Sequence, residues 1–232
     1  MSGPAGPWAI ATAAGKDATL ALHRARSRGM EVRWALNIFE GSSGLVRFHG
    51  TPRALVEAYA VRLGLRPHFA ETLPAGPGES VPRRDFETAL AGLLEGLKAK
   101  GAVGVLFGNL HLEEIRAWYE ARVARAGLEH REPLWGVRPA AVARAIPAMG
   151  FRARVVSVNL ELGDPAWLGR ELTPQLARTF ARVGIDPAGE RGEYHTFVHD
   201  GPGFRSPVPH RIVGEHEREG HRYLEIEPVS GQ

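Results

Sequence analysis

Hydrophobic residues follow two alternating patterns along the first part of the chain. Short apolar runs, typical of buried strands, alternate with segments in which apolar side chains recur every three or four residues, as on an amphipathic helix. The predicted strands are residues 8–11, 32–39, 65–73, 102–108 and 130–136. The predicted helices are residues 17–28, 51–64, 86–97 and 112–126. This alternation predicts an α/β fold, a mainly parallel sheet with helices on both faces.

Local signals set the ends of these elements. Thr51 and Pro52 predict the N-cap and first residue of the second helix, and Gly64 predicts its end. Gly127 closes the fourth helix in the same way. The Pro- and Gly-rich residues 74–82 predict a mobile loop before the third helix.

The pattern changes after residue 136. A helix at 137–149 precedes an extended segment at 151–160, and a Thr-capped helix at 173–184 follows. From Tyr194 onward, short strands are separated by Gly and Pro. We therefore predict two domains, a larger one at 1–136 and a smaller α+β domain at 137–232 packed on it.

Composition excludes several classes of function. The chain has no cysteine, which removes disulfides, thiolate nucleophiles, Cys-ligated zinc and iron–sulfur clusters. Its 29 basic residues are spread without a block and give a formal charge of only +3, which argues against a dedicated nucleic-acid surface. The first residues lack the pattern of a signal peptide, and no apolar run reaches the roughly 18 residues of a membrane span. We expect a cytoplasmic protein with no membrane partner.

Ligands of such sheets bind at the carboxyl ends of the strands, so the turns after the first and fourth strands are candidate sites. The first, "TAAGKDAT" (residues 12–19, the GKD loop), suits an anion. Small residues let backbone N–H groups approach a phosphate, and the following helix adds its positive end. Lys16 offers a cation, and Asp17 can hold Mg²⁺ or cap the helix. The alternative is that Asp17 is a plain first-turn acid and the small residues only pack.

The two best-known phosphate motifs do not fit this loop. The Walker pattern fails because Ile10 lies five residues before Gly15 and Asp17 replaces the hydroxyl residue. The dinucleotide pattern G-x-G-x-x-G fails because Gly15 is the one glycine there.

Three blocks, in order along the chain, carry a family resemblance. "AAGKDATLALHRA" (13–25) resembles the S-G-G-K-D-S-x-L-A-L loop of the PP-loop ATP pyrophosphatases. "FGNLHLEEIRAWYEARVARAGLEHREPLWG" (107–136) resembles the G-D-I…P-L-W segment of one branch, the diphthine–ammonia ligase family. "GERGEYHTFVHDGPGF" (189–204) resembles the G-E-x-G-E-F/Y-H-T-F-V-x-D-G-P block of that branch, and "WLGREL" (167–172) also fits.

The resemblance implies a Rossmann-like fold of the adenine-nucleotide α-hydrolase type, with ATP and Mg²⁺ as cofactors. It implies that ATP is cleaved to AMP and pyrophosphate while a substrate carboxylate is adenylated. Ammonia then displaces AMP to give an amide. The substrate is left open between a protein, such as an elongation factor carrying diphthine, and a small carboxylate. A homodimer is a further expectation.

The candidate site residues follow from these blocks. Nucleotide contacts are assigned to Thr12, Ala13, Ala14, Gly15, Lys16, Asp17, Gly108, Asn109 and Arg116. Catalytic roles are assigned to Lys16, Glu190, Glu193 and His195, substrate contacts to His111, Gly192 and Thr196, and Mg²⁺ binding to Asp17. The plain alternatives are a surface arginine at 116, an exposed His111–Glu114 pair and a charged hairpin turn at 189–196. Trp135, at the end of the fifth strand, and Trp167 could each stack on adenine, but we expect them in the core or at the domain interface. We expect "HEREGH" (216–221) at the surface.

The chain also departs from the family pattern. Ala13 and Ala14 replace Ser and Gly, Ala18 replaces Ser, and Asn109 replaces Asp. Thr12 and Thr19 are the neighbouring hydroxyls that could substitute. Alanine at 14 is tolerable at negative φ and costly at positive φ.

These departures leave two other functions open. One is a nucleotide-binding protein with weak or no turnover. The other is a PP-loop tRNA-modifying enzyme that needs no cysteine, although the absence of cysteine disfavours thiolation.

Overall fold

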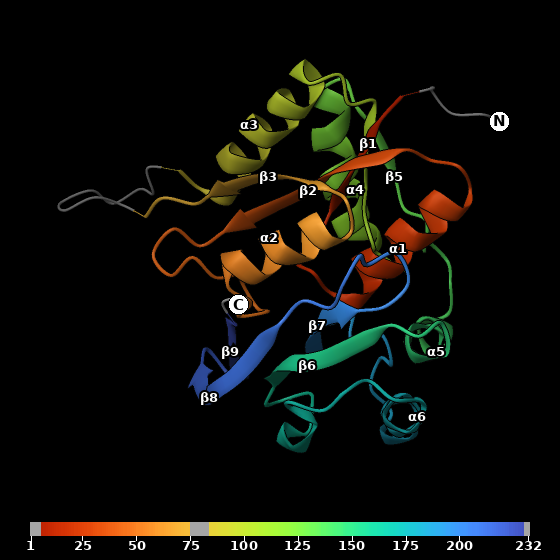
Figure 1. Cartoon of the computed structure of the whole chain (residues 1–232), viewed down its shortest axis with the longest axis vertical. Helices are drawn as coiled ribbons and strands as arrows, with labels where there is room; N and C mark the ends of the chain where they lie inside the picture. Colours follow the sequence, from red (N-terminus) through yellow and green to blue (C-terminus); the bar gives the residue numbers. More distant parts are fainter. Residues whose placement is uncertain (1–5, 75–83, 230–232) are drawn as a thin grey trace.

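The computed structural model describes residues 6–74 and 84–229, so residues 75–82 of the predicted loop lie outside the described residues. Its first half contains a parallel sheet of five strands in the order β3-β2-β1-β4-β5 (Figure 1). These strands are β1 (Trp8–Ala11), β2 (Val32–Phe39), β3 (Arg66–Glu71), β4 (Gly104–Leu106) and β5 (Glu129–Arg131). The predicted α/β fold is confirmed, and the strand order reverses between β1 and β4.

Helices cover both faces of this sheet. The covering helices are α1 (Lys16–Ser27), α2 (Arg53–Arg62), α3 (Phe86–Ala99) and α4 (Glu113–Arg125). Side chains alternate along each strand, so Ile10 packs in the same apolar cluster as α1 and α2, whereas Ala9 packs in the cluster of α3 and α4. The sheet is therefore buried from both sides, as apolar parallel strands require.

The second half contains a four-stranded antiparallel sheet in the order β7-β6-β9-β8 (Figure 1). Its elements are α5 (Pro139–Ala148), β6 (Arg152–Asn159), the short 3₁₀ helix Pro165–Trp167, α6 (Pro174–Val183), β7 (Tyr194–Asp200), β8 (His210–Arg218) and β9 (His221–Pro228). Thr173 caps α6 as predicted, because its hydroxyl accepts from the Leu176 amide at 3.2 Å.

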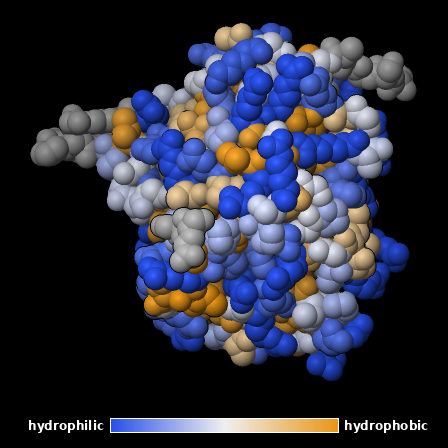
Figure 2. All heavy atoms as spheres, viewed as in Figure 1, coloured by the Kyte–Doolittle hydropathy of each residue, from blue (hydrophilic) through white to orange (hydrophobic). Residues whose placement is uncertain are grey.

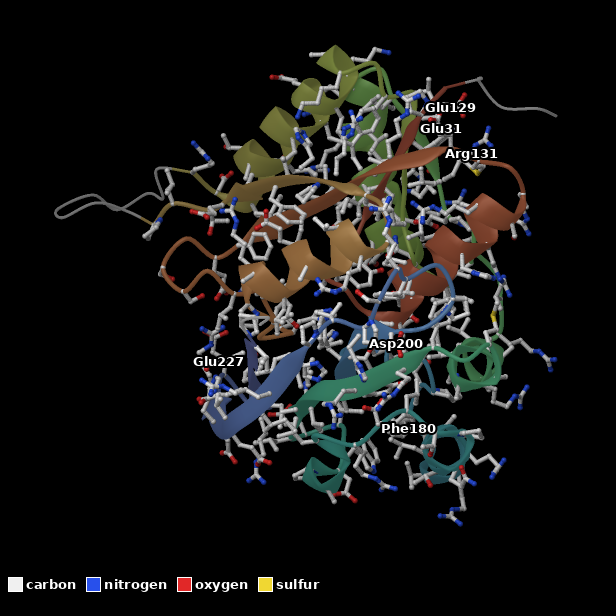
Figure 3. The ribbon with its side chains drawn as sticks, in the orientation of Figure 1. Glu31, Glu129, Arg131, Phe180, Asp200 and Glu227 are labelled. Carbon is white, nitrogen blue, oxygen red and sulfur yellow. The ribbon has the colours of Figure 1, made fainter. Side chains whose placement is uncertain are left out.

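One apolar cluster runs from the α1 and α2 face of the parallel sheet into the antiparallel sheet. Phe180 of α6, labelled in Figure 3, belongs to this cluster. The centre of its ring lies 4.8 Å from that of Trp167 and 4.5 Å from that of Tyr194. Trp167 is thus a core residue, as expected. The predicted boundary between residues 136 and 137 stays a prediction.

Three local predictions were wrong. The fifth strand ends at Arg131, because Pro133 cannot donate to a strand ladder, and Trp135 therefore lies in the following turn. The second helix begins at Arg53, because the Pro52 backbone is extended, and the Thr51 hydroxyl is buried without capping it. The helical spacing of Leu112, Ile115, Tyr119 and Val123 predicts that Ile115 lies on the apolar face of the fourth helix, but Ile115 is exposed.

On the face shown in Figure 2, hydrophilic side chains predominate and apolar ones form small separate groups. Among the described residues, the helices are all too short or too polar to cross a bilayer.

Candidate active site

A cleft with two lobes opens at the carboxyl edge of the parallel sheet, where the strand order reverses. The apolar lobe, about 610 Å³, is bounded mainly by β2, the segment between β2 and α2, and the segment after β4, with two residues of α3. The polar lobe, about 590 Å³, lies between the first turn of α1, residues 189–192 and β7. The lobes share a wall of Ala13, Phe48, His49, Gly108, Asn109, Tyr119 and His195. Ligands bind at this place in open α/β sheets.

The GKD loop links the end of β1 to α1 and is docked on β7. The Ala14 amide donates to the Thr12 hydroxyl at 2.9 Å, and the Lys16 amide donates to the Thr196 hydroxyl at 3.1 Å. The Ala14 carbonyl accepts from the Val198 amide at 2.8 Å. Thr196 is thus buried behind the loop and positions it.

Ala14 has a φ of 60°, in the left-handed region. This conformation costs an alanine about 1 kcal/mol, because its Cβ approaches the following carbonyl. An alanine at position 14 would be tolerated without strain only at negative φ, so the observed positive φ makes this alanine destabilising.

The hydroxyls near the loop are engaged inside the protein. The Thr12 hydroxyl accepts from Ala14, as described above. The Thr19 hydroxyl donates to the Gly15 carbonyl at 2.8 Å and lies 2.8 Å from the Tyr59 hydroxyl. Both threonines therefore stabilise the loop and the start of α1 in this structure.

Lys16 is buried, with 3% of its side chain exposed, and it lines neither lobe. Its ammonium donates to Asp17 at 2.8 Å and to the Ala188 carbonyl, and it lies 4.9 Å from the centre of the Tyr194 ring. Burial opposes its charge, but the charge and hydrogen bond of Asp17, together with Tyr194 and Glu190, outweigh burial and raise the pKa of Lys16 above its ordinary value. In this structure Lys16 joins α1 to the 186–190 segment.

Gly108 brings the end of β4 against the first turn of α1. A Cβ at this position would lie 2.7 Å from the Ala18 nitrogen and 2.8 Å from the Asp17 carbonyl carbon. Only glycine allows this approach, which sets the floor of the polar lobe.

Asn109 follows Gly108 and lines both lobes. Its side-chain amide donates to Glu132 at 2.7 Å. Arg116 lines neither lobe, because its guanidinium pairs with Glu132 and Glu120 and lies 4.5 Å from the Trp135 ring.

Two carboxylates line the polar lobe. Asp17 Oδ1 is buried without a hydrogen-bond partner among the described residues. Glu190 Oε2 accepts from the Leu110 amide at 3.1 Å. Burial, and then the charge of Asp17, raise the pKa of Glu190 to about 7. Glu190 therefore changes its protonation near neutral pH, as a general base in a cleft must.

The remaining predicted residues of the late block have different positions. Glu193 is buried outside both lobes, and its carboxylate accepts from the amides of Asp186 at 3.0 Å and Arg191 at 3.1 Å. Glu193 therefore holds the turn that presents Glu190 and Gly192 to the polar lobe. His111 lies 3.3 Å from Asp186 and lines neither lobe.

Sequence reasoning missed Phe48 and His49, which come from the segment between β2 and α2 and line both lobes. The His49 ring lies 4.4 Å from that of His195. Burial lowers the pKa of His49 to about 4, and burial together with His49 lowers the pKa of His195 well below its ordinary value. Both imidazoles are neutral at pH 7. Phe48 is 44% exposed, and its φ of 63° is a strained backbone conformation beside the cleft.

The hairpin of "HEREGH" is at the surface as predicted, with one exception. His221 lines the polar lobe, and its ring lies 6.0 Å from that of Phe48. Within residues 6–74 and 84–229, no three His, Asp or Glu side chains are grouped as a metal site.

Comparison with known families agrees with this geometry. Residues 8–130 match the family model described as the diphthamide synthase N-terminal domain. Residues 138–229 match the model described as the diphthamide synthase C-terminal domain. A search of curated proteins found no match.

Proposed function

The chain belongs to the diphthamide synthase family, whose members are PP-loop ATP-utilising ligases, and on that premise we propose that it adenylates a substrate carboxylate for attack by ammonia. A carboxylate oxygen attacks the α-phosphorus of ATP, the bond from the α-phosphorus to the oxygen that it shares with the β-phosphorus breaks, and pyrophosphate leaves. Ammonia then attacks the acyl carbon, AMP leaves with the oxygen that came from the carboxylate, and one proton is released. The products are an amide, AMP and pyrophosphate.

The two-lobed cleft is the observation that carries this proposal. Its apolar lobe is large enough to hold a nucleobase and is lined mainly by apolar residues, and its polar lobe begins at the N-terminus of α1. Phosphates at that end would meet the positive pole of the helix and the backbone around Gly15. The reacting α-phosphorus would then lie beside Glu190, where the second substrate can enter.

Asp17 suits Mg²⁺, because its Oδ1 is buried beside the polar lobe without a partner among the described residues. Protein sites for Mg²⁺ commonly use one or two carboxylates, with phosphates and water completing the shell. Asp17 would hold the ion, which would neutralise charge on the phosphates.

Glu190 is the group best placed to take the proton in the second half-reaction. With a pKa of about 7, it is substantially ionised at neutral pH and still a strong enough base to accept a proton from the attacking amine. His195 lines the same lobe as a neutral imidazole and can accept a hydrogen bond from ammonia. Glu193 supports Glu190 by fixing the turn that presents it.

A second candidate, a nucleotide-binding protein without turnover, is favoured by one observation. The Lys16 ammonium donates to Ala188 and Asp17, and Lys16 itself lines neither lobe, so a cation for the phosphates must come from rearrangement or from the ion at Asp17.

One assay separates the two candidates. The purified protein is incubated with ATP, Mg²⁺ and ¹⁵N-ammonium, together with a diphthine-bearing elongation factor or a panel of small carboxylic acids. The ligase predicts AMP and pyrophosphate in equal amounts and ¹⁵N in the amide product. Saturable ATP binding without AMP release under any of these additions would favour the binding protein, and ADP with phosphate would contradict both.

A further inference from the structure

Glu132 is a buried carboxylate that the proposed reaction does not use. It directly follows β5, and 2% of its side chain is exposed. Its Oε1 accepts from the Asn109 amide at 2.7 Å and lies 3.4 Å from His130 Nε2. Its Oε2 lies 3.7 Å from Arg116 Nε. Burying a carboxylate is costly, so a chain that keeps one beside a cleft has a use for its geometry.

The hydrogen bond to Glu132 decides which way the Asn109 amide faces. The Asn109 amide nitrogen donates to Glu132 Oε1, so its NH₂ group faces Glu132. Its carbonyl oxygen then lies on the opposite side. Because Asn109 lines both lobes and its nitrogen is engaged with Glu132, this oxygen is the amide atom that remains to accept a hydrogen bond from a ligand in the cleft. The shared wall thus presents an uncharged hydrogen-bond acceptor.

The position of Asn109 indicates what it meets. A nucleotide with its base in the apolar lobe and its phosphates at the N-terminus of α1 must place its ribose at the shared wall. Ribose hydroxyls are hydrogen-bond donors, which match a carbonyl oxygen. We infer that Glu132 is a positioning residue that turns Asn109 to accept from a ribose hydroxyl of the nucleotide. This inference rests on the proposed nucleotide site.

The pair also explains why this chain has Asn at 109. An aspartate there would bring two carboxylates to hydrogen-bond distance, since the partner atoms are 2.7 Å apart. Asn109→Asp should therefore be tolerated only when Glu132 is replaced by a donor, as in the double variant N109D/E132Q. In that variant the amide introduced at position 132 would donate to one oxygen of the new carboxylate, and the other oxygen would face the cleft.

Calorimetric titration with ATP, 2′-deoxy-ATP and 3′-deoxy-ATP in Mg²⁺ tests the inference on wild type, E132L, N109D and N109D/E132Q. Wild type should bind one deoxy analogue about three- to tenfold more weakly than ATP, the worth of one hydrogen bond. E132L and N109D should lose this preference, and N109D/E132Q should regain it. Glu120→Gln is the matched control, because Glu120 also pairs with Arg116 but is exposed on α4. It should behave as wild type.

Equal binding of the three nucleotides to wild type would overturn the inference. A preference for ATP that persists in folded E132L, or that N109D/E132Q fails to regain while it stays folded, would also overturn it. Thermal unfolding of each variant establishes folding independently. Absence of ATP binding by wild type would overturn the proposed nucleotide site itself.

Discussion

Glu190→Gln should make the protein more stable and less active, and the gain in stability should depend on pH. Glutamine keeps an oxygen for the Leu110 amide, so the substitution removes the charge and leaves the contact. The folded protein holds the pKa of Glu190 near 7, above the ordinary value of 4.5. A carboxyl with a raised pKa in the folded state is stabilising while protonated, and this contribution is lost as pH rises from 4.5 through 7.

The size of the effect follows from the pKa. At about 1.36 kcal/mol per pKa unit, a rise from 4.5 to about 7 corresponds to an upper limit of about 3 kcal/mol. Solvent reaches part of this half-buried side chain, and screening reduces the cost to about 1.5 kcal/mol. For a chain of this length, that free energy raises the midpoint of thermal unfolding by about 3–6 °C.

The measurement is thermal unfolding of wild type and Glu190→Gln at pH 5 and pH 8, without nucleotide and with a chelator. The variant should be more stable at pH 8, and the difference should shrink at pH 5, where Glu190 is mostly protonated in the folded protein. Glu57→Gln, an exposed glutamate on α2, is the control and should show no pH-dependent difference. Equal or lower stability of Glu190→Gln at pH 8 would refute the reasoning. Amide formation should fall at least about a hundredfold.

Three further changes test the loop. Ala14→Gly should raise stability by about 1 kcal/mol in urea unfolding, because glycine relieves the left-handed conformation; a loss would mean that the strain is absent. Gly108→Ala should weaken ATP binding at least tenfold by pushing the first turn of α1, whereas Gly92→Ala on α3, with open space around it, should leave binding unchanged; equal effects would contradict this. Lys16→Met should lower the free energy of unfolding by about 3 kcal/mol, because it leaves Asp17 unpaired, and an unchanged value would contradict the buried pair.

Much of the fold could be predicted from local pattern. Residues 32–39 are apolar except for Arg33 and Asn37, and the predicted strand has the same ends as β2. The overlong fifth strand shows the limit, because Leu134 and Trp135 are apolar but follow Pro133, which ends the ladder. The start of α2 lies one residue later than predicted, because Pro52 can be either the first helical residue or the N-cap residue before it.

The candidate site was less accessible to sequence reasoning, because it depends on contacts distant along the chain. Lys16 is in the predicted loop, but its ammonium bonds to Ala188, 172 positions later, and no local pattern indicates that. Phe48 and His49 lie in an irregular connection with no periodicity. A positive φ at Phe48, a strained value for an aromatic residue, was the one signal, and it is visible only in the structure.

Transfer of oxygen from the substrate carboxylate to AMP tests the proposed reaction most directly. With a substrate labelled by ¹⁸O in both carboxylate oxygens, the AMP is analysed by mass spectrometry after turnover with ammonia. Adenylation predicts one ¹⁸O in the AMP phosphate and none in pyrophosphate. Unlabelled AMP, or label in inorganic phosphate alongside ADP, would contradict an acyl-adenylate formed in this cleft.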